Sequence, residues 1–554
     1  MLSSHMCLLE NKGEMMQMKS IMFVGAISMG AFLSFAGTLD VSMLPGEHWW
    51  GGANNFGGQM PYSSASVVHM DLTKSNYSNQ FSSFLVSDKG RYVWCDEQTQ
   101  ISISNGVIRM TAASATPQLI VAGRTLREAF LAAAAKHFPS SGKSPDPLFF
   151  SAPQYNTWIE LTYFQSQDKI MEYAKSMIDN GLPPGVFMVD DTWQEGYGTW
   201  EFNPRTFPNP KEMCDELHKM GFKVMLWICP WVSMDSPAYR RIVSGINPGS
   251  VVREKHTGGF YLGTDGLPAA SRWWNGQSAL LDFTHPNANR WFQAQLDRLV
   301  KDYGVDGFKF DGGELGHYVR GGLKTHDPTV STADQTYLYG KYALEYRFSE
   351  YRNAWRLQGQ PVVVRLIDKD HSWKAVRALV TDMIAGGLLG YPFVCPDMVG
   401  GGSWTAFLPG APFDAELFVR SAQVHALCGQ MQFSASPWRV LDDEKKQIVR
   451  DTVKIRQKFA QYFVELSQEC GRTGEPMIRN LEYVFPGRGY ATVVDEFMMG
   501  DKLLVAPVME KGKRERKVIL PPGTWKADDG MVFEGPKEIT VKAPLSRLPH
   551  FVKR

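Results

Sequence analysis

Hydrophobic and polar positions follow three successive patterns along the chain. In residues 38–146, short runs with β-strand composition are separated by turn residues, which predicts an N-terminal β-sandwich. These runs are Ser66–Asp71, Phe81–Val86, Arg91–Cys95, Ile101–Met110 and Leu119–Ala122. The glycine-rich segment His48–Gly58 interrupts them, and we expect it to be a surface loop. A stretch with helical spacing, Thr125–His137, leads out of this domain.

Strand-like and helix-like segments alternate through residues 147–470. The segments that we expect to be strands are Gln154–Glu160, Val186–Asp190, Phe222–Trp227, Phe308–Asp311 and Val362–Ile367. Stretches with helical spacing lie between them, including one near 334–350. Alternation of this kind is typical of parallel strands that are joined by crossover helices.

Acidic residues recur just after the predicted strands. They are Asp190, Asp191, Asp311, Asp368 and Asp397. In a (β/α)8 barrel the functional groups gather at the C-terminal ends of the strands, whereas a dinucleotide-binding sheet would carry a GxGxxG motif after its first strand. No such motif follows the first strand here. We therefore predict an α/β fold with a catalytic (β/α)8 TIM barrel over residues 147–470.

The last part of the chain, residues 471–554, returns to a β pattern. Runs at Tyr490–Val494, Lys502–Val508, Arg516–Leu520 and Ile539–Val541, with the sequence PPGTW as a turn, predict a C-terminal β-sandwich. The basic run 511–517 is expected to form a solvated hairpin, because a run of like charges usually faces water.

The first 37 residues have a pattern of their own. Lys19 precedes an apolar run, Ile21–Phe35, which ends at Ala36 and Gly37. This order predicts a signal peptide over residues 1–37 and a secreted or periplasmic protein. The alternative is a buried strand of a domain whose beginning is missing. The run is short for a membrane helix, so no integral membrane span is expected.

Composition narrows the range of partners. The 554-residue chain has a formal net charge of +1, which gives no reason to expect nucleic acid or an anionic membrane. Its seven cysteines and twelve histidines are scattered and form no metal-binding spacing. We therefore expect neither a metal nor a cofactor.

The segment GVDGFKFDGGEL, residues 304–315, carries the strongest chemical signal. Period-two alternation places Lys309 and Asp311 on one face of a strand, and two glycines follow the carboxylate. Such a pair fits either a catalytic site at the end of a barrel strand or a buried structural ion pair.

Several ordered motifs resemble glycoside hydrolase family 31. They are GFKFDGGE, VDDTWQEGYGTWEFNPRTFPNP, GFKVMLWICPWV, LLDFTHP and DEFMMGDKLLVAPVMEKG, followed by PPGTW, and they extend over roughly residues 150–554. HWWGG, RWWNG and GYPFVCPDMVGG are most similar to the branch of the myogenesis-regulating glycosidase and bacterial α-galactosidases. The stretch before HWWGG is shorter than the family's N-terminal sandwich, so we expect a reduced or truncated N-terminal domain.

The resemblance implies a retaining exo-α-glycosidase, with Asp311 as the nucleophile and Asp368 as the acid/base. Arg352 lies sixteen residues before Asp368, a spacing that the family shares, and Asp370 is the competing acid/base. The α-glucosidases of the family have Trp-x-Asp and Ser-His-Asp where this chain has Lys309-x-Asp311 and Cys395-Pro396-Asp397. This difference favours galactose over glucose in an oligosaccharide or glycoconjugate substrate.

The expected substrate-binding residues are Asp190, Asp191, Trp227, Trp274, Lys309, Arg352 and Asp397. Structural alternatives stay open for several of them: Asp190 could cap a helix, Arg352 could form an ion pair on a helix, and a tryptophan could be plain core. The alternative functions are an α-glucosidase or α-xylosidase of the same family, and a carbohydrate-binding protein without catalytic activity.

Overall fold

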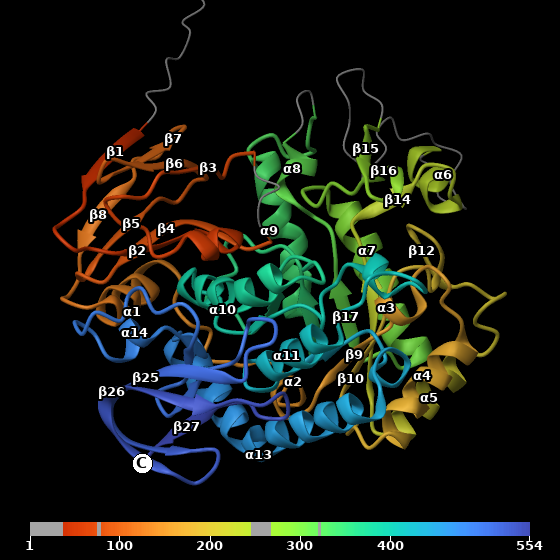
Figure 1. Ribbon diagram of the computed structural model, residues 1–554. Coiled ribbons are helices and arrows are strands. Elements are labelled where there is room, and N and C mark those ends of the chain that lie inside the picture. The colour runs from red at the N-terminus through yellow and green to blue at the C-terminus, as the bar shows by residue number, and fades with distance from the viewer. Residues whose placement is uncertain (1–36, 75–78, 245–267, 320–322) are drawn as a thin grey trace, which may run out of the picture. The chain divides into compact units, whose positions relative to one another are not determined.

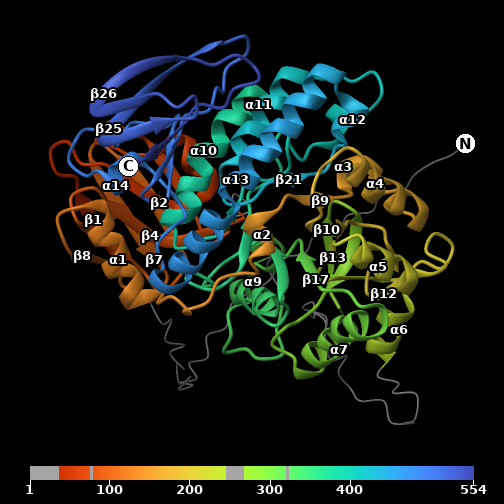
Figure 2. The same ribbon diagram turned by 90° about the horizontal axis from the view of Figure 1, so that it is seen from below.

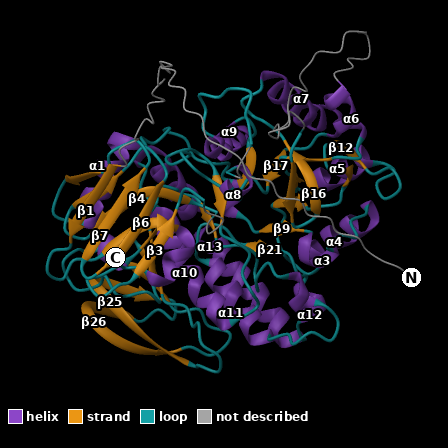
Figure 3. Ribbon diagram, turned by 90° about the horizontal axis from the view of Figure 1, so that it is seen from above, coloured by secondary structure: helices purple, strands orange, loops and turns teal. Residues whose placement is uncertain are grey.

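The computed structural model describes residues 37–74, 79–244, 268–319 and 323–554 (Figure 1). The predicted signal peptide lies outside the described residues except for Gly37, which begins strand β1 (Gly37–Ser42). Antiparallel sheets come first and last along the chain, and a parallel barrel lies between them in sequence. Figure 3 shows the antiparallel strands to one side of the barrel strands.

The N-terminal region consists of two four-stranded antiparallel sheets with the orders β1-β7-β6-β3 and β2-β4-β5-β8. Their further strands are β2 (Trp49–Ala53), β3 (Val68–Asp71), β4 (Phe81–Ser87), β5 (Arg91–Trp94), β6 (Thr99–Ser104), β7 (Val107–Ala112) and β8 (Gln118–Val121). Helix α1 (Leu126–His137) follows and is capped by Thr125, as its sequence pattern predicts.

Two predictions for this region are wrong. The segment His48–Gly58 is not a surface loop, because strand β2 within it is fully buried and pairs with β4. Burial of the apolar surface of Trp49 and Trp50 stabilises this strand and outweighs the preference of the glycines for loops. The predicted strand Ile101–Met110 is the hairpin β6–β7, which turns at Asn105 and Gly106, both with positive φ.

Eight parallel strands form the barrel in the order β20-β19-β18-β17-β13-β10-β9-β21. They are β9 (Gln154–Asn156), β10 (Val186–Val189), β13 (Lys223–Ile228), β17 (Gly307–Phe310), β18 (Phe348–Tyr351), β19 (Val363–Arg365), β20 (Val394–Cys395) and β21 (Gln432–Phe433). An isolated parallel bridge between Met398 and Gln432 nearly closes the ring between its two ends. The predicted (β/α)8 barrel with flanking sheet domains is confirmed.

Helices surround these strands, as Figure 2 shows. The helices around the barrel are α4 (Gln167–Asp179), α5 (Pro210–Lys219), α7 (Pro286–Tyr303), α10 (Trp373–Leu388), α11 (Ala415–Ala426) and α13 (Asp443–Thr473). Helix α10 also contacts β2 of the N-terminal region and the C-terminal strand β22 (Ile478–Arg479). Both antiparallel regions therefore pack on this barrel helix.

Two barrel segments differ from the prediction. The strand expected at Gln154–Glu160 ends at Asn156 and is followed by helix α3 (Trp158–Leu161). The helix expected near 334–350 comprises α9 (Gln335–Gly340) and a 3-10 turn, and it is followed by strand β18. β18 has the sequence FSEY, in which Ser349 and Glu350 interrupt the apolar residues and conceal the strand from a search for apolar runs.

The C-terminal sheet has six antiparallel strands in the order β22-β23-β24-β27-β25-β26. Its other strands are β23 (Phe497–Met499), β24 (Leu503–Val505), β25 (Glu515–Ala527), β26 (Val532–Lys542) and β27 (His550–Lys553). PPGTW is not a turn but part of β25, where the register shifts between Leu520 and Gly523. A bulge tolerates proline because no ladder N–H is required there. Tyr490–Val494, expected to be a strand, lies outside every strand.

The N-terminal region reaches the mouth of the barrel through two amide side chains. Nε2 of Gln80 donates hydrogen bonds to the backbone oxygens of Arg352 (2.7 Å) and Arg365 (2.9 Å). Nδ2 of Asn79 donates to the same oxygen of Arg365 at 3.1 Å. Residues outside the barrel thus hold the backbone at the C-terminal ends of β18 and β19.

Gly307 on β17 lies against Phe348 on β18, and its substitution tests how tightly these two barrel strands pack. A Cβ atom at this position would lie 1.7 Å from the backbone oxygen of Phe348 on β18. We expect Gly307→Ala to lower the free energy of unfolding by about 3 kcal/mol, since neither strand can move without disturbing the ring. Urea unfolding followed by tryptophan fluorescence measures the change.

Gly196→Ala is the matched control, because no atom lies within 4 Å of a Cβ built at Gly196. This variant should stay within about 0.5 kcal/mol of the parent. Equal losses in the two variants would contradict the packing that the structure shows between β17 and β18.

Candidate active site

A cavity of about 390 Å³ opens at the C-terminal ends of the barrel strands. This is the position at which barrel proteins carry their functional groups, and the volume suits a small ligand. Its lining residues are Trp158, Tyr163, Asp190, Asp191, Trp227, Trp274, Lys309, Asp311, Arg352, Arg365, Asp368, Asp370, Met398, Gly402, Ser403 and Trp404.

Asp311 follows β17 directly and is held on both oxygens. Its Oδ2 accepts a hydrogen bond from the indole of Trp227 at 2.8 Å, and its Oδ1 pairs with the guanidinium of Arg352 at 3.1 Å. Burial alone would raise the pKa of this carboxyl. The charges of Arg352 and Lys309 outweigh burial and hold the pKa of Asp311 well below its usual range. Asp311 is therefore an oriented carboxylate anion at neutral pH.

The two glycines after Asp311 make room for this arrangement. Gly312 and Gly313 both have positive φ, and a Cβ at Gly312 would lie 2.0 Å from the ring of Trp231. Only glycine fits a left-handed backbone this close to an aromatic ring. The sequence GG thus lets the chain turn away immediately behind the carboxylate.

Lys309 and Asp190 form a buried ion pair beside Asp311. Nζ of Lys309 donates to Oδ2 of Asp190 at 2.6 Å, and the side chains are only 4% and 3% exposed. Lys309 lies on β17 and Asp190 follows β10, so the pair bridges two barrel strands across β13. The alternative of a helix cap for Asp190 is thereby excluded, because Asp190 precedes no helix in the structure.

Asp191 lies among neutral hydrogen-bond donors. It accepts hydrogen bonds from Tyr197 (3.2 Å), Asn275 (2.7 Å) and Gln194 (3.2 Å), and it forms no ion pair with any basic residue that the structure describes. Burial, with the neighbouring charge of Asp190, raises the pKa of Asp191 to about 7. Asp191 can therefore either donate or accept a hydrogen bond near neutral pH.

Asp368 lies in the loop after β19 and pairs with an arginine. Its Oδ1 accepts from Arg365 at 2.6 Å, and its side chain is 42% exposed to the cavity. Burial would raise the pKa of Asp368, but Arg365 and Arg352 lower it further than burial raises it, while the charge of Asp311 opposes them. Asp370 also lines the cavity and is exposed.

Arg365 connects Asp368 to a second, fully buried carboxyl. The same guanidinium nitrogen donates to Oδ1 of Asp397 at 2.7 Å, and the backbone N–H of Lys369 donates to Oδ2 at 2.8 Å. Burial, together with the charge of Asp368, raises the pKa of Asp397 to about 6. Asp397 is 0% exposed and does not line the cavity, so it supports Arg365 from behind.

Aromatic side chains surround the outer part of the cavity. Trp274 is 44% exposed, and the guanidinium of Arg352 lies 5.1 Å from the centre of its ring. Trp158 and Tyr163 pack edge to face with ring centres 5.2 Å apart. Flat apolar rings of this kind suit the C–H faces of a sugar.

The structure brings eight of the nine predicted site residues to one cavity and places Asp397 just behind it. Sequence reasoning missed Arg365, Trp158, Tyr163 and Trp404 among the lining residues. A signal existed for Arg365, because it is a charged residue inside the apolar run Val362–Ile367. The other three lie in loops or a short helix whose position only the fold decides.

Comparisons with known proteins agree with this site. Residues 150–466 match the glycosyl hydrolases family 31 TIM-barrel domain, and residues 474–554 match the family's C-terminal domain. The chain belongs to glycoside hydrolase family 31. Its resemblance to the family, predicted from sequence motifs, is therefore confirmed.

Two relatives are similar to this chain over most of its length. The chain is 34% identical to the myogenesis-regulating glycosidase of Mus musculus over 72% of this chain and 55% of the relative. It is 25% identical to the alpha-xylosidase XylQ of Lactiplantibacillus pentosus over 82% of this chain and 60% of the relative. The chain thus spans little more than half the length of these two relatives.

A solved structure shows the same fold. The family 31 alpha-xylosidase from a soil metagenome, complexed with xylose, superimposes with a TM-score of 0.78 over 94% of this chain and 79% of that chain, at 22% identity. In the part of the chain that the structure describes, no cluster of His, Cys, Asp and Glu could hold a metal ion. Within the same residues, no helix is both long and apolar enough to cross a membrane.

The Lys309–Asp190 pair gives a direct test of the site's electrostatics. Lys309→Met should lower the free energy of unfolding by about 3–5 kcal/mol, because it leaves the buried carboxylate of Asp190 without its partner. Chemical unfolding measures this loss. Adding Asp190→Asn to Lys309→Met should restore at least half of it, since the charge that needed a partner is then gone.

Lys175→Met, on the exposed face of α4, is the matched control and should change stability by less than about 0.5 kcal/mol. If Lys309→Met lowered the free energy of unfolding as little as this control, the burial of the ion pair away from water would be contradicted.

Proposed function

We propose that the protein is a retaining exo-α-glycosidase that removes terminal α-linked galactose from oligosaccharides or glycoconjugates. The observation that carries this proposal is one cavity lined by an ionised carboxyl, Asp311, and by a second carboxyl, Asp368, from another strand. Retaining glycosidases use two such groups, one as a nucleophile and one as an acid/base. Membership of glycoside hydrolase family 31 supports this chemistry.

Asp311 is suited to the nucleophilic role. In the first step its carboxylate attacks the anomeric carbon, a glycosyl ester forms, and the glycosidic C–O bond breaks. Arg352 and Trp227 fix the direction of the carboxylate by binding its two oxygens. Their hydrogen bonds spare the nucleophile any reorientation in the transition state.

Asp368 is suited to the acid/base role. It donates its proton to the leaving oxygen in the first step, and in the second it takes a proton from the water that cleaves the ester. The negative charge of Asp311 raises the pKa of Asp368, and that charge disappears when the ester forms. The pKa of Asp368 therefore falls between the two steps, which is the direction that turns an acid into a base.

Galactose is proposed because this chain has Lys309 where the α-glucosidases of the family have a tryptophan. Lys309 and Asp190 place an ammonium and a carboxylate together at the buried side of the cavity. Sugars that differ in one hydroxyl are separated by buried hydrogen-bonding groups that one isomer leaves unpaired. The similarity to an alpha-xylosidase keeps xylose as the competing sugar.

A panel of four p-nitrophenyl α-glycosides tests the proposal. We expect kcat/KM for the α-galactoside to exceed the values for the α-glucoside, α-xyloside and α-mannoside by about tenfold or more, as buried polar recognition provides. Asp311→Asn should lower kcat by at least about a thousandfold. A cyclophellitol-type α-galactose probe should label Asp311, as mass spectrometry of the peptide would show.

A higher rate on the xyloside or glucoside would refute the galactose assignment and leave the glycosidase intact. If no glycoside were cleaved and no probe attached, the protein would instead be a binding protein without catalytic activity.

The pH profile tests the role of Asp368. Catalysis requires Asp368 to be protonated, and its lowered pKa leaves few molecules in that form at pH 7. The kcat/KM for a galactosyl disaccharide should therefore rise about tenfold for each unit that the pH falls, until the pKa of Asp368 is reached.

Asp368→Ala should abolish this pH dependence and spare aryl galactosides, whose leaving groups need no proton, more than the disaccharide. Asp370→Ala is the control and should retain the parent profile. If the two variants exchanged behaviours, Asp370 would be the acid/base.

A further inference from the structure

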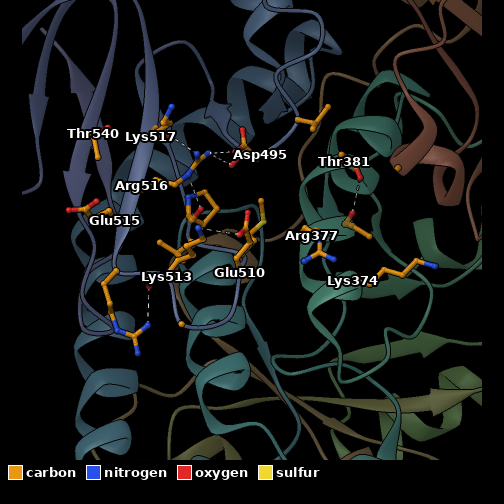
Figure 4. Close-up of a pocket in the computed structure, with 18 residues that line it drawn as sticks. Lys374, Arg377, Thr381, Asp495, Glu510, Lys513, Glu515, Arg516, Lys517 and Thr540 are labelled. Carbon is orange, nitrogen blue, oxygen red and sulfur yellow. Dashed lines mark hydrogen bonds and ion pairs between the residues drawn. The ribbon is translucent and has the colours of Figure 1, made fainter. Parts of the chain in front are cut away.

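A second cavity, separate from the barrel mouth, lies between helix α10 and the C-terminal sheet. Its volume is about 880 Å³, against about 390 Å³ for the cavity at the barrel mouth. Figure 4 shows side chains of α10 on one side and side chains of the C-terminal region on the other. The two cavities share no lining residue. This size is within the range of pockets that bind small molecules.

The interior of this cavity is apolar. Pro507, Val508 and Met509, which follow β24, are buried, and Ala378 lies on the facing side of α10. These groups offer van der Waals contact and no hydrogen bonds to the body of a ligand.

Charged side chains surround that apolar interior, and most of them are basic. Six basic residues line the cavity against three acidic ones. The basic residues are Lys374, Arg377, Lys513, Arg514, Arg516 and Lys517, and the acidic ones are Asp495, Glu510 and Glu515. Because the whole chain has a formal net charge of only +1, this excess is a local property of the cavity.

The basic residues of the C-terminal side have acidic partners. Arg514 pairs with Glu416 at 2.6 Å and Arg516 with Asp495 at 2.8 Å. These pairs hold the two guanidinium groups in place. Arg514 donates from Nη1 to Glu416 and to the backbone oxygen of Lys513, which leaves its Nε and Nη2 donors for a ligand. Arg516 also donates to the backbone oxygens of Pro507, Lys517 and Asp495, so its role is to hold this wall of the cavity in place. Residues 511–517 are largely exposed, as predicted, and residues 512–517 also form one wall of this cavity.

Two basic residues of α10, Lys374 and Arg377, line the cavity on the side opposite the C-terminal region. Lys374 and Arg377 are exposed and lie one helical turn apart, and their side chains form no hydrogen bond or ion pair with any residue that the structure describes. Like charges at this spacing repel each other and destabilise a helix. An anion bound between them would remove that repulsion.

We propose that this cavity binds a small organic molecule with at least two anionic groups. One anionic group pairs with Lys374 and Arg377 on α10, and the other with Arg514 on the opposite side. The body of the ligand lies over Pro507, Val508 and Met509. Arginine binds carboxylate, sulfate and phosphate groups through parallel N–H donors, so sulfated or uronic oligosaccharides and organic phosphates share the required chemistry.

Isothermal titration calorimetry at low ionic strength tests this site with the full chain. The probes are a sulfated heparin-type disaccharide, trigalacturonate and fructose 1,6-bisphosphate, with inorganic sulfate alone as a fourth ligand. We expect at least one organic probe to bind saturably with a stoichiometry of one, and the affinity to fall as salt is added. The probe that binds most tightly identifies the source of the anionic groups.

Lys374→Glu with Arg377→Glu should weaken that binding at least tenfold. The matched control is Lys175→Glu with Lys458→Glu, which changes the net charge equally on exposed faces of α4 and α13 and should stay within twofold of the parent. Asp311→Asn should bind the probe like the parent, whatever its effect on glycoside cleavage. Thermal unfolding of each variant checks that it is folded.

The proposal is overturned if no organic probe binds, or if the α10 variant binds as tightly as the parent. It is also overturned if inorganic sulfate binds as tightly as every organic probe, or if Asp311→Asn abolishes probe binding. The last result would place the probe in the barrel cavity.

Discussion

The guanidinium of Arg365 is the group on which the mouth of the barrel depends. It is 1% exposed and donates to Asp368 and to Asp397, while Glu350 lies 3.6 Å from its Nε. Removing one member of such a buried network leaves an unpaired charge, which costs about 3–5 kcal/mol. The three acidic residues come from β18 and from the loops after β19 and β20, so their attraction to one cation joins three neighbouring strand ends. The position of Asp368 in the cavity follows from this shared cation.

The same electrostatics divide the carboxyls of the cavity into different protonation states. Asp311 is surrounded by Arg352, Lys309 and the indole of Trp227, and its pKa is well below its usual range. Asp191 has neutral hydrogen-bond donors and an acidic neighbour, and its pKa rises to about 7. Chemically identical side chains thus receive different pKa values from their neighbours. The antiparallel region contributes to this arrangement, because Gln80 holds the backbone of both Arg352 and Arg365.

Helix α10 lines the second cavity and follows a loop that lines the cavity at the barrel mouth. It begins at Trp373, shortly after the loop that carries Asp368, and its exposed turns carry Lys374 and Arg377. Five acidic residues and three basic ones line the barrel cavity, whereas six basic residues and three acidic ones line the second cavity. The two are therefore suited to ligands of different charge.

Local sequence determined much of this protein. Strand–helix alternation and acidic residues after strands specified the barrel, and the alternation in GFKFDGGE placed Lys309 and Asp311 on one face, because a strand has a side-chain period of two. Four other features needed the tertiary structure. Strand β18 has two polar residues among its four, β2 is glycine-rich, Arg365 lies in an apolar run, and the exposed basic run 511–517 also forms one wall of a cavity. The conformation or role of each depends on burial against segments distant in sequence, or on the cavity between α10 and β25. Contacts of that kind depend on how the chain closes on itself, which no local pattern of residues contains.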